Sequence, residues 1–575
     1  MNICKSTRDT RAPAAEDSAE KKISIFSIIY YTMKQPILLI FLLVLASFAF
    51  AQLNIETKQP QVQTSNGILE GVNSSGIKIF KGIPFAKPPV GSLRWREPQP
   101  VESWTGIRKA DKFGPRAMQL PLFSDMVFRS DGLSEDCLYL NIWTPAKSSN
   151  ERLPVLVYFF GGGFVAGDGS EFRYEGESMA RNGIVAITVN QRLGVFGFMA
   201  HPDLSKESSY HGSGNYGLMD QAAALKWIQK NIASFGGDPK KVTIAGESAG
   251  SYSVSAQMAS PLSKNLIAGA IAESGSLLSF NPTTSLADAE KLGAEFANRV
   301  GAKSLAELRA MPAQQLLDET SKPESSRFPV NVDGYFFPKS PEKIFSSGEQ
   351  AHVPLLVGWN SEEGNYRSVI GQEKATVENY IKGVQRMVGD EASEILQIYK
   401  ASTDAEVEQA GTDLASDMFI GFSTWKLSDQ QSRTGGRPVY RYLYSRPRPL
   451  TKEQSARLLL GQTDGSLPKD TLASATRKQA TLGAGHSIEI EYAMGNLPTN
   501  RVYDWQPEDF KISEIMQGFF INFIKTGNPN GTGLPQWPSL QQGKPASVMQ
   551  INVNTMAETE KNRERYLYLD SKVER

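Results

Sequence analysis

Little in this sequence can build a disulfide scaffold or a metal centre. It has two cysteines and four histidines in 575 residues, and the histidines show no paired metal-ligand spacing. An excess of charge of either sign is also absent, because 61 Lys plus Arg balance 61 Asp plus Glu. These shortages predict a chain with no disulfide framework, no zinc site and no nucleic-acid partner.

Apolar material is present in the amount typical of a folded, water-exposed protein. Hydrophobic residues make up 40% of the chain and aromatic residues 10%, which is enough for a sizeable core. This composition argues against a disordered, collagen-like or multi-span membrane protein.

The first 51 residues have the pattern of a targeting segment. Met33-Lys34 precede an apolar run from Ile37 to Phe50, and Ala49-Phe50-Ala51 is a small-x-small pattern before Gln52. A charged start, a short apolar run and a cleavage pattern together predict a secretory signal peptide. We therefore expect translation to begin at Met33, and residues 1–51 to be an N-terminal extension plus signal peptide.

One alternative is that Ile23–Tyr31 and the later run form a single uncleaved anchor, although Lys34 and Pro36 interrupt it. The favoured interpretation leaves no stable membrane span after cleavage. It predicts a secreted or periplasmic protein in which Cys137 is the one remaining cysteine.

Residues 52–575 show no internal repeat and are predicted to form a single domain. Short apolar runs at Val155–Phe160, Ile184–Val189 and Val242–Ala245 are each bounded by turn residues and contain no proline, as buried parallel strands do. Between the last two runs, apolar side chains recur at helical spacing, at Leu218, Ala222, Leu225, Ile228 and Ile232. Alternating strands and helices predict an α/β fold with a mostly parallel sheet.

The motif that carries chemistry is G-x-S-x-G, at Gly246-Glu247-Ser248-Ala249-Gly250. The pattern alone is weak, but here it follows a predicted strand and precedes Ser251–Ala259, which can start a helix. A nucleophile elbow needs this arrangement, because flanking glycines allow the sharp turn that exposes the serine. Ser248 is therefore a candidate nucleophile.

A serine nucleophile requires a base and an acid, and on this type of fold the expected order is serine, acid, histidine. Only His352 and His486 follow Ser248, and His352 would come before the acid candidates. His486 lies in a glycine-rich loop, where functional residues are common. The acid is either Glu362 or Glu363, which follow a predicted strand end.

Acyl transfer also needs backbone N–H groups that stabilise the developing oxyanion. Gly161-Gly162-Gly163, directly after a predicted strand, offers such donors without side chains to block a substrate. The N–H of Ala249, next to the candidate nucleophile, would complete an oxyanion hole.

A series of blocks through most of the mature chain matches one known family. They are Phe80–Ala86, Pro88–Gly91, Leu93–Trp95, Ser134–Asn141, the triple glycine, Asn190–Gly194, Asn215–Leu218 with Asp220-Gln221, Phe235–Pro239, Glu489–Tyr492 after His486, Asn522-Phe523 and Thr526–Asn530. Together these blocks resemble the type-B carboxylesterase family, the cholinesterase-like branch of the α/β-hydrolases.

The resemblance implies a role for individual residues. It implies Ser248 as nucleophile, His486 as general base and Glu363, rather than Glu362, as the acid. It also implies oxyanion donors at Gly162, Gly163 and Ala249. The fold implied is an α/β-hydrolase fold with a central mostly parallel sheet, helices on both faces, large insertions and a gorge that leads to the serine.

Three departures from the family pattern bear on substrate and stability. Phe160 stands before the triple glycine where the family often has His or Tyr. Ala117 occupies the place of the cysteine that usually pairs with the one at Cys137, so we expect an unpaired thiol. Residues 117–137 contain no tryptophan to hold a quaternary ammonium, which disfavours a choline substrate. This loop offers other apolar side chains instead, at Phe123, Met126 and Phe128.

These features predict a secreted serine carboxylesterase that hydrolyses small-molecule or polymer-linked esters through an acyl-enzyme, without cofactor or metal. The alternative is a non-catalytic, cholinesterase-like adhesion or binding protein. Because such proteins typically lack a member of the triad, the presence of all three candidate residues favours the enzyme. The sequence sets no oligomeric state.

Overall fold

The computed structural model describes residues 59–280, 283–325, 327–463 and 483–573. The predicted start at Met33 and the predicted signal segment 1–51 lie outside the described residues. The compact unit that begins at Pro60 contains all the helices and strands described below.

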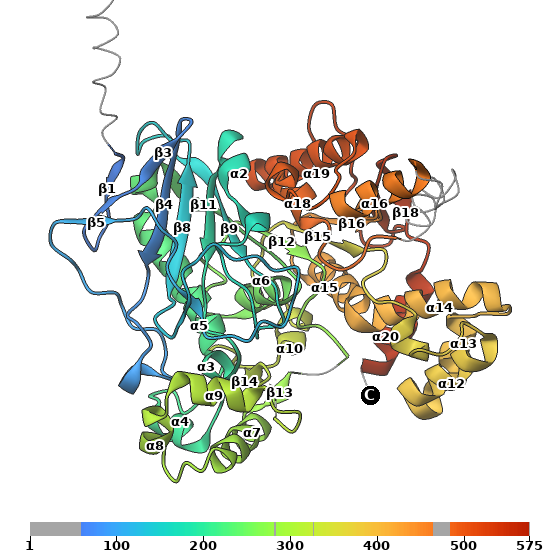
Figure 1. Cartoon of the computed structure of the whole chain (residues 1–575), viewed down its shortest axis with the longest axis horizontal. Helices are drawn as coiled ribbons and strands as arrows, with labels where there is room; N and C mark the ends of the chain where they lie inside the picture. The colour runs from blue at the N-terminus through green and yellow to red at the C-terminus, as the bar shows by residue number, and fades with distance from the viewer. Residues whose placement is uncertain (1–58, 281–282, 326, 464–482, 574–575) are drawn as a thin grey trace, which may run out of the picture. The chain divides into compact units, whose positions relative to one another are not determined.

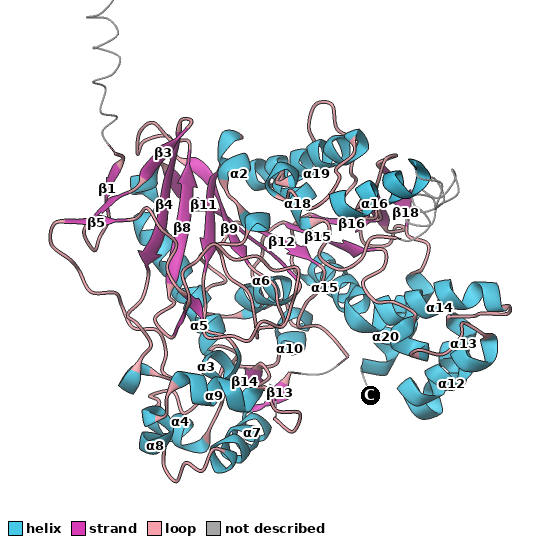
Figure 2. Cartoon of the chain, viewed as in Figure 1, coloured by secondary structure: helices cyan, strands magenta, loops and turns pink. Residues whose placement is uncertain are grey.

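An eleven-stranded mixed sheet runs through the molecule (Figures 1 and 2). In sheet order its strands are β18 (Met556–Thr559), β17 (Ser547–Ile551), β16 (Val439–Tyr444), β15 (Leu355–Asn360), β12 (Gly269–Glu273), β11 (Gly237–Glu247), β9 (Leu153–Phe159), β10 (Val185–Val189), β8 (Tyr139–Thr144), β4 (Ile77–Pro84) and β3 (Val72–Ser74). All pairs from β17 to β10 are parallel, and the pairs at the two edges are antiparallel.

The three predicted apolar runs form adjacent strands at the centre of this sheet. Val155 of β9 lies opposite Val185 of β10 and Val242 of β11, in parallel register. Every residue of β10 is buried, as expected for a strand covered on both faces. The predicted α/β fold with a mostly parallel sheet is therefore confirmed.

Helices pack on both faces of the sheet. The predicted helix over residues 218–232 is α5 (Tyr216–Asn231), which packs against α6 (Ala249–Ala259). Helix α6 packs on β11 and β12, whereas α19 (Pro507–Thr526) packs on β9 and β11 from the other side (Figure 1). The nucleophile motif, at the junction of β11 and α6, thus lies within the most enclosed part of the fold.

The remaining helices follow the chain around this centre. They are α2 (Glu177–Arg181), α3 (Gly194–Phe198), α4 (Pro202–Glu207), α7 (Leu286–Arg299), α8 (Leu305–Ala310), α9 (Ala313–Thr320), α10 (Pro341–Ser346), α11 (Arg367–Ile370), α12 (Val377–Val388), α13 (Ala392–Ile398), α14 (Asp404–Ser416), α15 (Phe422–Thr434), α16 (Lys452–Thr463), α18 (Ile490–Met494) and α20 (Arg563–Val573). Three small sheets complete the described structure, with strands β1 (Gln61–Gln63), β2 (Ile68–Glu70), β5 (Ile107–Lys109), β6 (Arg116–Ala117), β7 (Leu133–Ser134), β13 (Thr284–Ser285) and β14 (Asn331–Val332).

The insertion from α11 to α15 has its own apolar cluster, which includes Tyr380, Trp425 and Tyr566 of α20. Between α14 and α15 the helix widens into the π-helical turn η5 (Asp417–Gly421), which brings Phe419 to the histidine loop described below. No helix within the described ranges is both long and apolar enough to cross a membrane.

Cys137 is buried and unpaired. Burial raises the pKa of its thiol well above the usual value, which disfavours the reactive thiolate. Pairing of β6 with β7 and a hydrogen bond from Arg116 to the Ser130 carbonyl close the loop that a disulfide would otherwise link.

Candidate active site

Ser248 occupies a sharp turn between β11 and α6. Its φ of 56° and ψ of −121° are strained for a non-glycine residue, at a cost of about 1–3 kcal/mol. The Ser248 N–H donates to the Glu273 carbonyl at 2.9 Å, and the Tyr252 N–H donates to the Ser248 carbonyl at 2.9 Å. A Cβ at Gly250 would lie 2.1 Å from the Phe159 carbonyl oxygen, so only glycine allows this close approach. The turn has the geometry of a nucleophile elbow.

The triple glycine lies directly against this turn. A Cβ at Gly161 would lie 3.3 Å from the Ser248 Cβ and 2.8 Å from the Glu247 Oε2. Gly162 and Gly163 have φ values of 108° and 63°, which favour glycine. Ala249 is the first residue of α6, so its N–H has no acceptor within the helix. The predicted oxyanion donors and Ser248 thus meet in one place.

His486 contacts Glu363 across 123 residues of sequence, with His486 Nδ1 2.6 Å from the Glu363 Oε2. The other carboxylate oxygen of Glu363 accepts from the Asn360 N–H at 2.6 Å and from the Ser274 hydroxyl at 2.5 Å. Glu363 is buried, and these donors fix its orientation. The carboxylate is therefore presented to the imidazole ring.

The two rejected candidates lie elsewhere. The Glu362 side chain accepts from the Gly483 N–H at 2.5 Å and its own N–H donates to the Ala484 carbonyl at 2.8 Å, so it holds the backbone of the histidine loop. His352 is exposed, with its Nε2 2.8 Å from the Gly348 carbonyl oxygen.

The serine and the histidine are not hydrogen-bonded to each other among the residues that the structure describes. The His486 Nε2 instead lies 3.2 Å from Oε1 of Glu247, the residue that precedes Ser248. The ring therefore stands beside the elbow with its second nitrogen turned to a carboxylate. Catalytic hydrogen bonds that are absent without substrate often form in the substrate complex.

Buried carboxyl groups surround His486. Burial raises the pKa of Glu247 to about 8. Burial and the charge of Glu363 raise the pKa of Glu489 to about 7. The pKa of Glu273 is raised well above its usual value by burial and by Glu489. No group of three or more His, Cys, Asp or Glu in the described ranges is arranged to hold a metal ion.

The imidazole titrates together with these carboxyls. Burial disfavours its charged form, but the carboxylates of Glu247 and Glu363 outweigh burial and raise the pKa of His486 to about 10. A proton on Glu247 removes the largest of these attractions. The protonation of His486 is therefore coupled to that of Glu247.

Several residues of the site escape sequence reasoning. Glu489 lies in the same block as His486, and its spacing of three residues was the available signal; its Oε2 accepts from the Asn360 amide at 2.5 Å. Ser274 has no local motif. Phe419 packs edge-on against the imidazole with ring centroids 5.2 Å apart, yet it is 52% exposed and belongs to a distant helical insertion.

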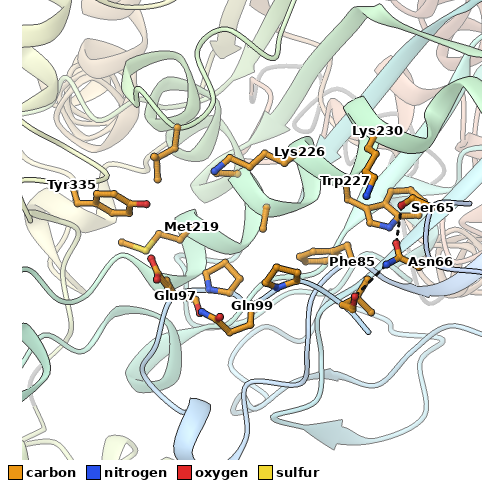
Figure 3. A pocket seen from close by; sticks show the side chains of 16 residues that line it. Ser65, Asn66, Phe85, Glu97, Gln99, Met219, Lys226, Trp227, Lys230 and Tyr335 are labelled. Atoms are coloured by element: carbon orange, nitrogen blue, oxygen red, sulfur yellow. Dashed lines mark hydrogen bonds between the residues drawn. The ribbon is translucent and has the colours of Figure 1, made fainter. Parts of the chain in front are cut away.

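A pocket of about 330 Å³ lies away from these groups (Figure 3). It is formed by α5 and the segment before β5, and Ser248, Glu363 and His486 do not line it. Glu97 faces one end, and Lys226 and Lys230 lie on the α5 side. These opposed charges single out no ligand class, so the chemistry belongs to the elbow.

Comparisons with known proteins agree with this geometry. A family model described as the carboxylesterase family matches residues 58–568. Fumonisin B1 esterase of Sphingopyxis macrogoltabida is 33% identical over 510 residues, covering 85% of this chain and 86% of that protein. Liver carboxylesterase of Sus scrofa is 33% identical over 550 residues, covering 88% and 90%. These similar proteins are named as hydrolases, so the non-catalytic alternative is not favoured.

Solved structures show the same fold. Carboxylesterase EST55 of Geobacillus stearothermophilus aligns with a TM-score of 0.73 at 29% identity, over 88% of this chain and 99% of that chain. A structure of PNB esterase aligns with a TM-score of 0.72 at 29% identity, over 90% and 99%. The predicted α/β-hydrolase fold is confirmed.

Proposed function

Because the chain belongs to the carboxylesterase family and is a carboxylic ester hydrolase, we propose that Ser248 is its nucleophile, His486 its general base and Glu363 the acid of a triad. The oxyanion donors are the N–H groups of Gly162, Gly163 and Ala249. The observation that supports this assignment best is the short contact between His486 Nδ1 and the buried Glu363, directly beside the strained elbow.

The reaction proceeds through two acyl-transfer steps. The Nε2 of His486 takes the Ser248 hydroxyl proton as Oγ attacks the ester carbonyl, and the three N–H groups stabilise the oxyanion. The alcohol leaves with the proton from His486. The same histidine then activates a water molecule that hydrolyses the acyl-enzyme and releases the carboxylic acid. Glu363 stabilises the imidazolium in both steps. No cofactor enters.

A covalent probe tests the nucleophile. The purified protein should hydrolyse p-nitrophenyl acetate, butyrate and octanoate, with a burst when deacylation is slow. A p-nitrophenyl alkylphosphonate should stop turnover, release one equivalent of p-nitrophenol and leave the phosphonyl group on Ser248, which peptide mass spectrometry locates. Hydrolysis that continues with Ser248 unlabelled would contradict the proposal.

Glu247→Gln should change the pH dependence of the reaction. The Glu247 carboxylate favours the imidazolium, so its removal lowers the pKa of His486. Because the neutral imidazole is the active base, the acidic limb of kcat/KM should move to lower pH by about one unit or more. The plateau of kcat should fall about tenfold, because the imidazolium formed in the transition state loses a partner. The measurement is a pH profile of kcat/KM for both proteins.

Lys241→Gln is a control for this substitution, because Lys241 is an exposed residue of β11. Its pH profile should match that of the unaltered enzyme. An acidic limb that stays in place in Glu247→Gln, or that moves to higher pH, would show that Glu247 does not act on the base.

The substrate and the location of the enzyme remain proposals based on the sequence. We propose that it is exported, that residues 1–51 are removed, and that it acts on small-molecule or polymer-linked esters other than choline esters. N-terminal sequencing of the exported protein should begin at Gln52, and any other start would contradict the predicted cleavage site.

A further inference from the structure

A buried arginine stands between two loops that frame the proposed site. Arg173 lies in the 3-10 turn η2 (Phe172–Tyr174), and its side chain is 6% exposed. Its Nε donates to Oε1 of the buried Glu171 at 2.7 Å. Burial disfavours the charge of Arg173, but Glu171 outweighs burial and raises the pKa of Arg173 above its usual range. The guanidinium therefore stays ionised inside the protein.

The guanidinium reaches the residue that follows His486. Its Nη1 donates to the Ser487 Oγ at 3.3 Å and to the Asp125 Oδ2 at 3.3 Å. Met126, next to Asp125, approaches the triple glycine: its Cε would lie 3.1 Å from a Cβ placed on Gly162. Arg173 thus joins the histidine loop to the loop beside the oxyanion donors.

The backbone that carries Arg173 is itself held firmly. The amide of the buried Asn496 donates to the carbonyl oxygens of Arg173 and Glu175, both at 2.9 Å. Helix α18, which follows the histidine loop, packs on η2. The guanidinium therefore has a rigid base from which to position its partners.

Ser487 needs an external partner because of its backbone conformation. Its φ is 65°, in the left-handed region that a non-glycine residue adopts at a cost. The residues before His486 are held from β15, where the Asn360 amide donates to the Gly485 carbonyl at 2.8 Å. On the other side of His486, the Ser487 side chain is held by Arg173.

We propose that Arg173 is a positioning residue for the base: by holding Ser487 in its left-handed conformation, it keeps His486 oriented between Glu363 and the elbow. This inference rests on the proposed triad. Without the guanidinium, Ser487 relaxes toward negative φ, and the adjoining peptide turns the imidazole away from Glu363. A displaced base slows the chemical step and leaves substrate binding almost unchanged.

Two substitutions measure this effect. Arg173→Lys keeps a charge beside Glu171, but a compact ammonium cannot span Glu171 and Ser487 as the planar guanidinium does. We expect kcat to fall about tenfold in Arg173→Lys and about 10²-fold in Arg173→Met, with KM within about threefold of the unaltered enzyme. Titration with the phosphonate counts the competent sites, so that kcat refers to folded enzyme.

Ser487→Gly separates positioning from a general loss of stability. Glycine adopts a φ of 65° without the cost that a Cβ imposes, so it needs no anchor. Ser487→Gly alone should keep kcat within about threefold, and the double variant Arg173→Lys/Ser487→Gly should recover most of the kcat lost in Arg173→Lys. A purely structural role for Arg173 predicts no recovery, because the double variant still lacks the guanidinium.

Arg441→Lys is the matched control, since Arg441 is a buried arginine of β16 that pairs with Glu560. It should lower the melting temperature without changing kcat per titrated site. An unchanged kcat in both Arg173 variants, or a loss that Ser487→Gly fails to suppress, would overturn the inference. Failure of the triad itself has a different signature, namely ester hydrolysis by the unaltered enzyme with Ser248 unlabelled.

Discussion

Replacing Ser248 by alanine should lower kcat by a factor of about 10³–10⁶ on p-nitrophenyl esters. The substitution removes the atom that forms the acyl-enzyme, while the oxyanion donors and the base remain. Residual hydrolysis then depends on water attacking the bound ester. The burst should also vanish, because no covalent intermediate accumulates. Stopped-flow and steady-state assays of the two proteins measure both effects.

A matched serine in the same helix controls for the loss of a hydroxyl. The Ser255 hydroxyl donates to the Tyr252 carbonyl at 2.8 Å and accepts from the Leu277 N–H at 3.1 Å, so Ser255→Ala loses hydrogen bonds inside α6. We expect a stability cost of about 1–3 kcal/mol and kcat within about threefold. Equal losses of activity in Ser248→Ala and Ser255→Ala would show damage to the helix rather than loss of a nucleophile.

Glu363→Gln should lower kcat by a factor of about 10²–10⁴. The amide keeps the size of the side chain, and its oxygen can still accept from the Asn360 N–H. Its NH₂ group then faces His486 Nδ1 and favours the tautomer whose Nε2 carries the proton, which cannot accept the Ser248 proton. The imidazolium also loses the carboxylate that stabilises it. Steady-state kinetics across pH 6–9 should show this loss at every pH.

Glu362→Gln is the adjacent control, because the Glu362 carboxylate accepts from the Gly483 N–H and an amide oxygen can do the same. Its kcat should stay within about threefold. The reverse ranking of Glu362→Gln and Glu363→Gln would assign the acid to the other residue. If Ser248 and Glu363 act as one unit, the double variant Ser248→Ala/Glu363→Gln should be no slower than Ser248→Ala.

The strands and the elbow could be predicted because their signals are local. Apolar runs such as Val155–Phe160 and Val242–Ala245 predict buried strands directly, since a strand covered on both faces tolerates few polar side chains. The glycines around Ser248 are likewise readable, because a strained turn between a strand and a helix excludes other residues.

The choice between the two glutamates shows where local reasoning ends. Residue chemistry and spacing left Glu362 and Glu363 open, and the family resemblance favoured Glu363. They differ in the structure because consecutive residues after β15 face different neighbours: one carboxylate meets the backbone at Gly483, and the other meets the His486 ring. The roles themselves remain predictions until the variants are measured.

By itself, the sequence determined the parallel α/β core, the serine turn and the family, because each is encoded in short stretches of residues. Only the tertiary structure decided what surrounds His486: the buried Glu247 and Glu489, the Phe419 ring and the Arg173 guanidinium. These groups come from β11, the histidine loop, η5 and η2. Their meeting depends on sheet register and on how insertions pack, and no single segment of the chain contains that information.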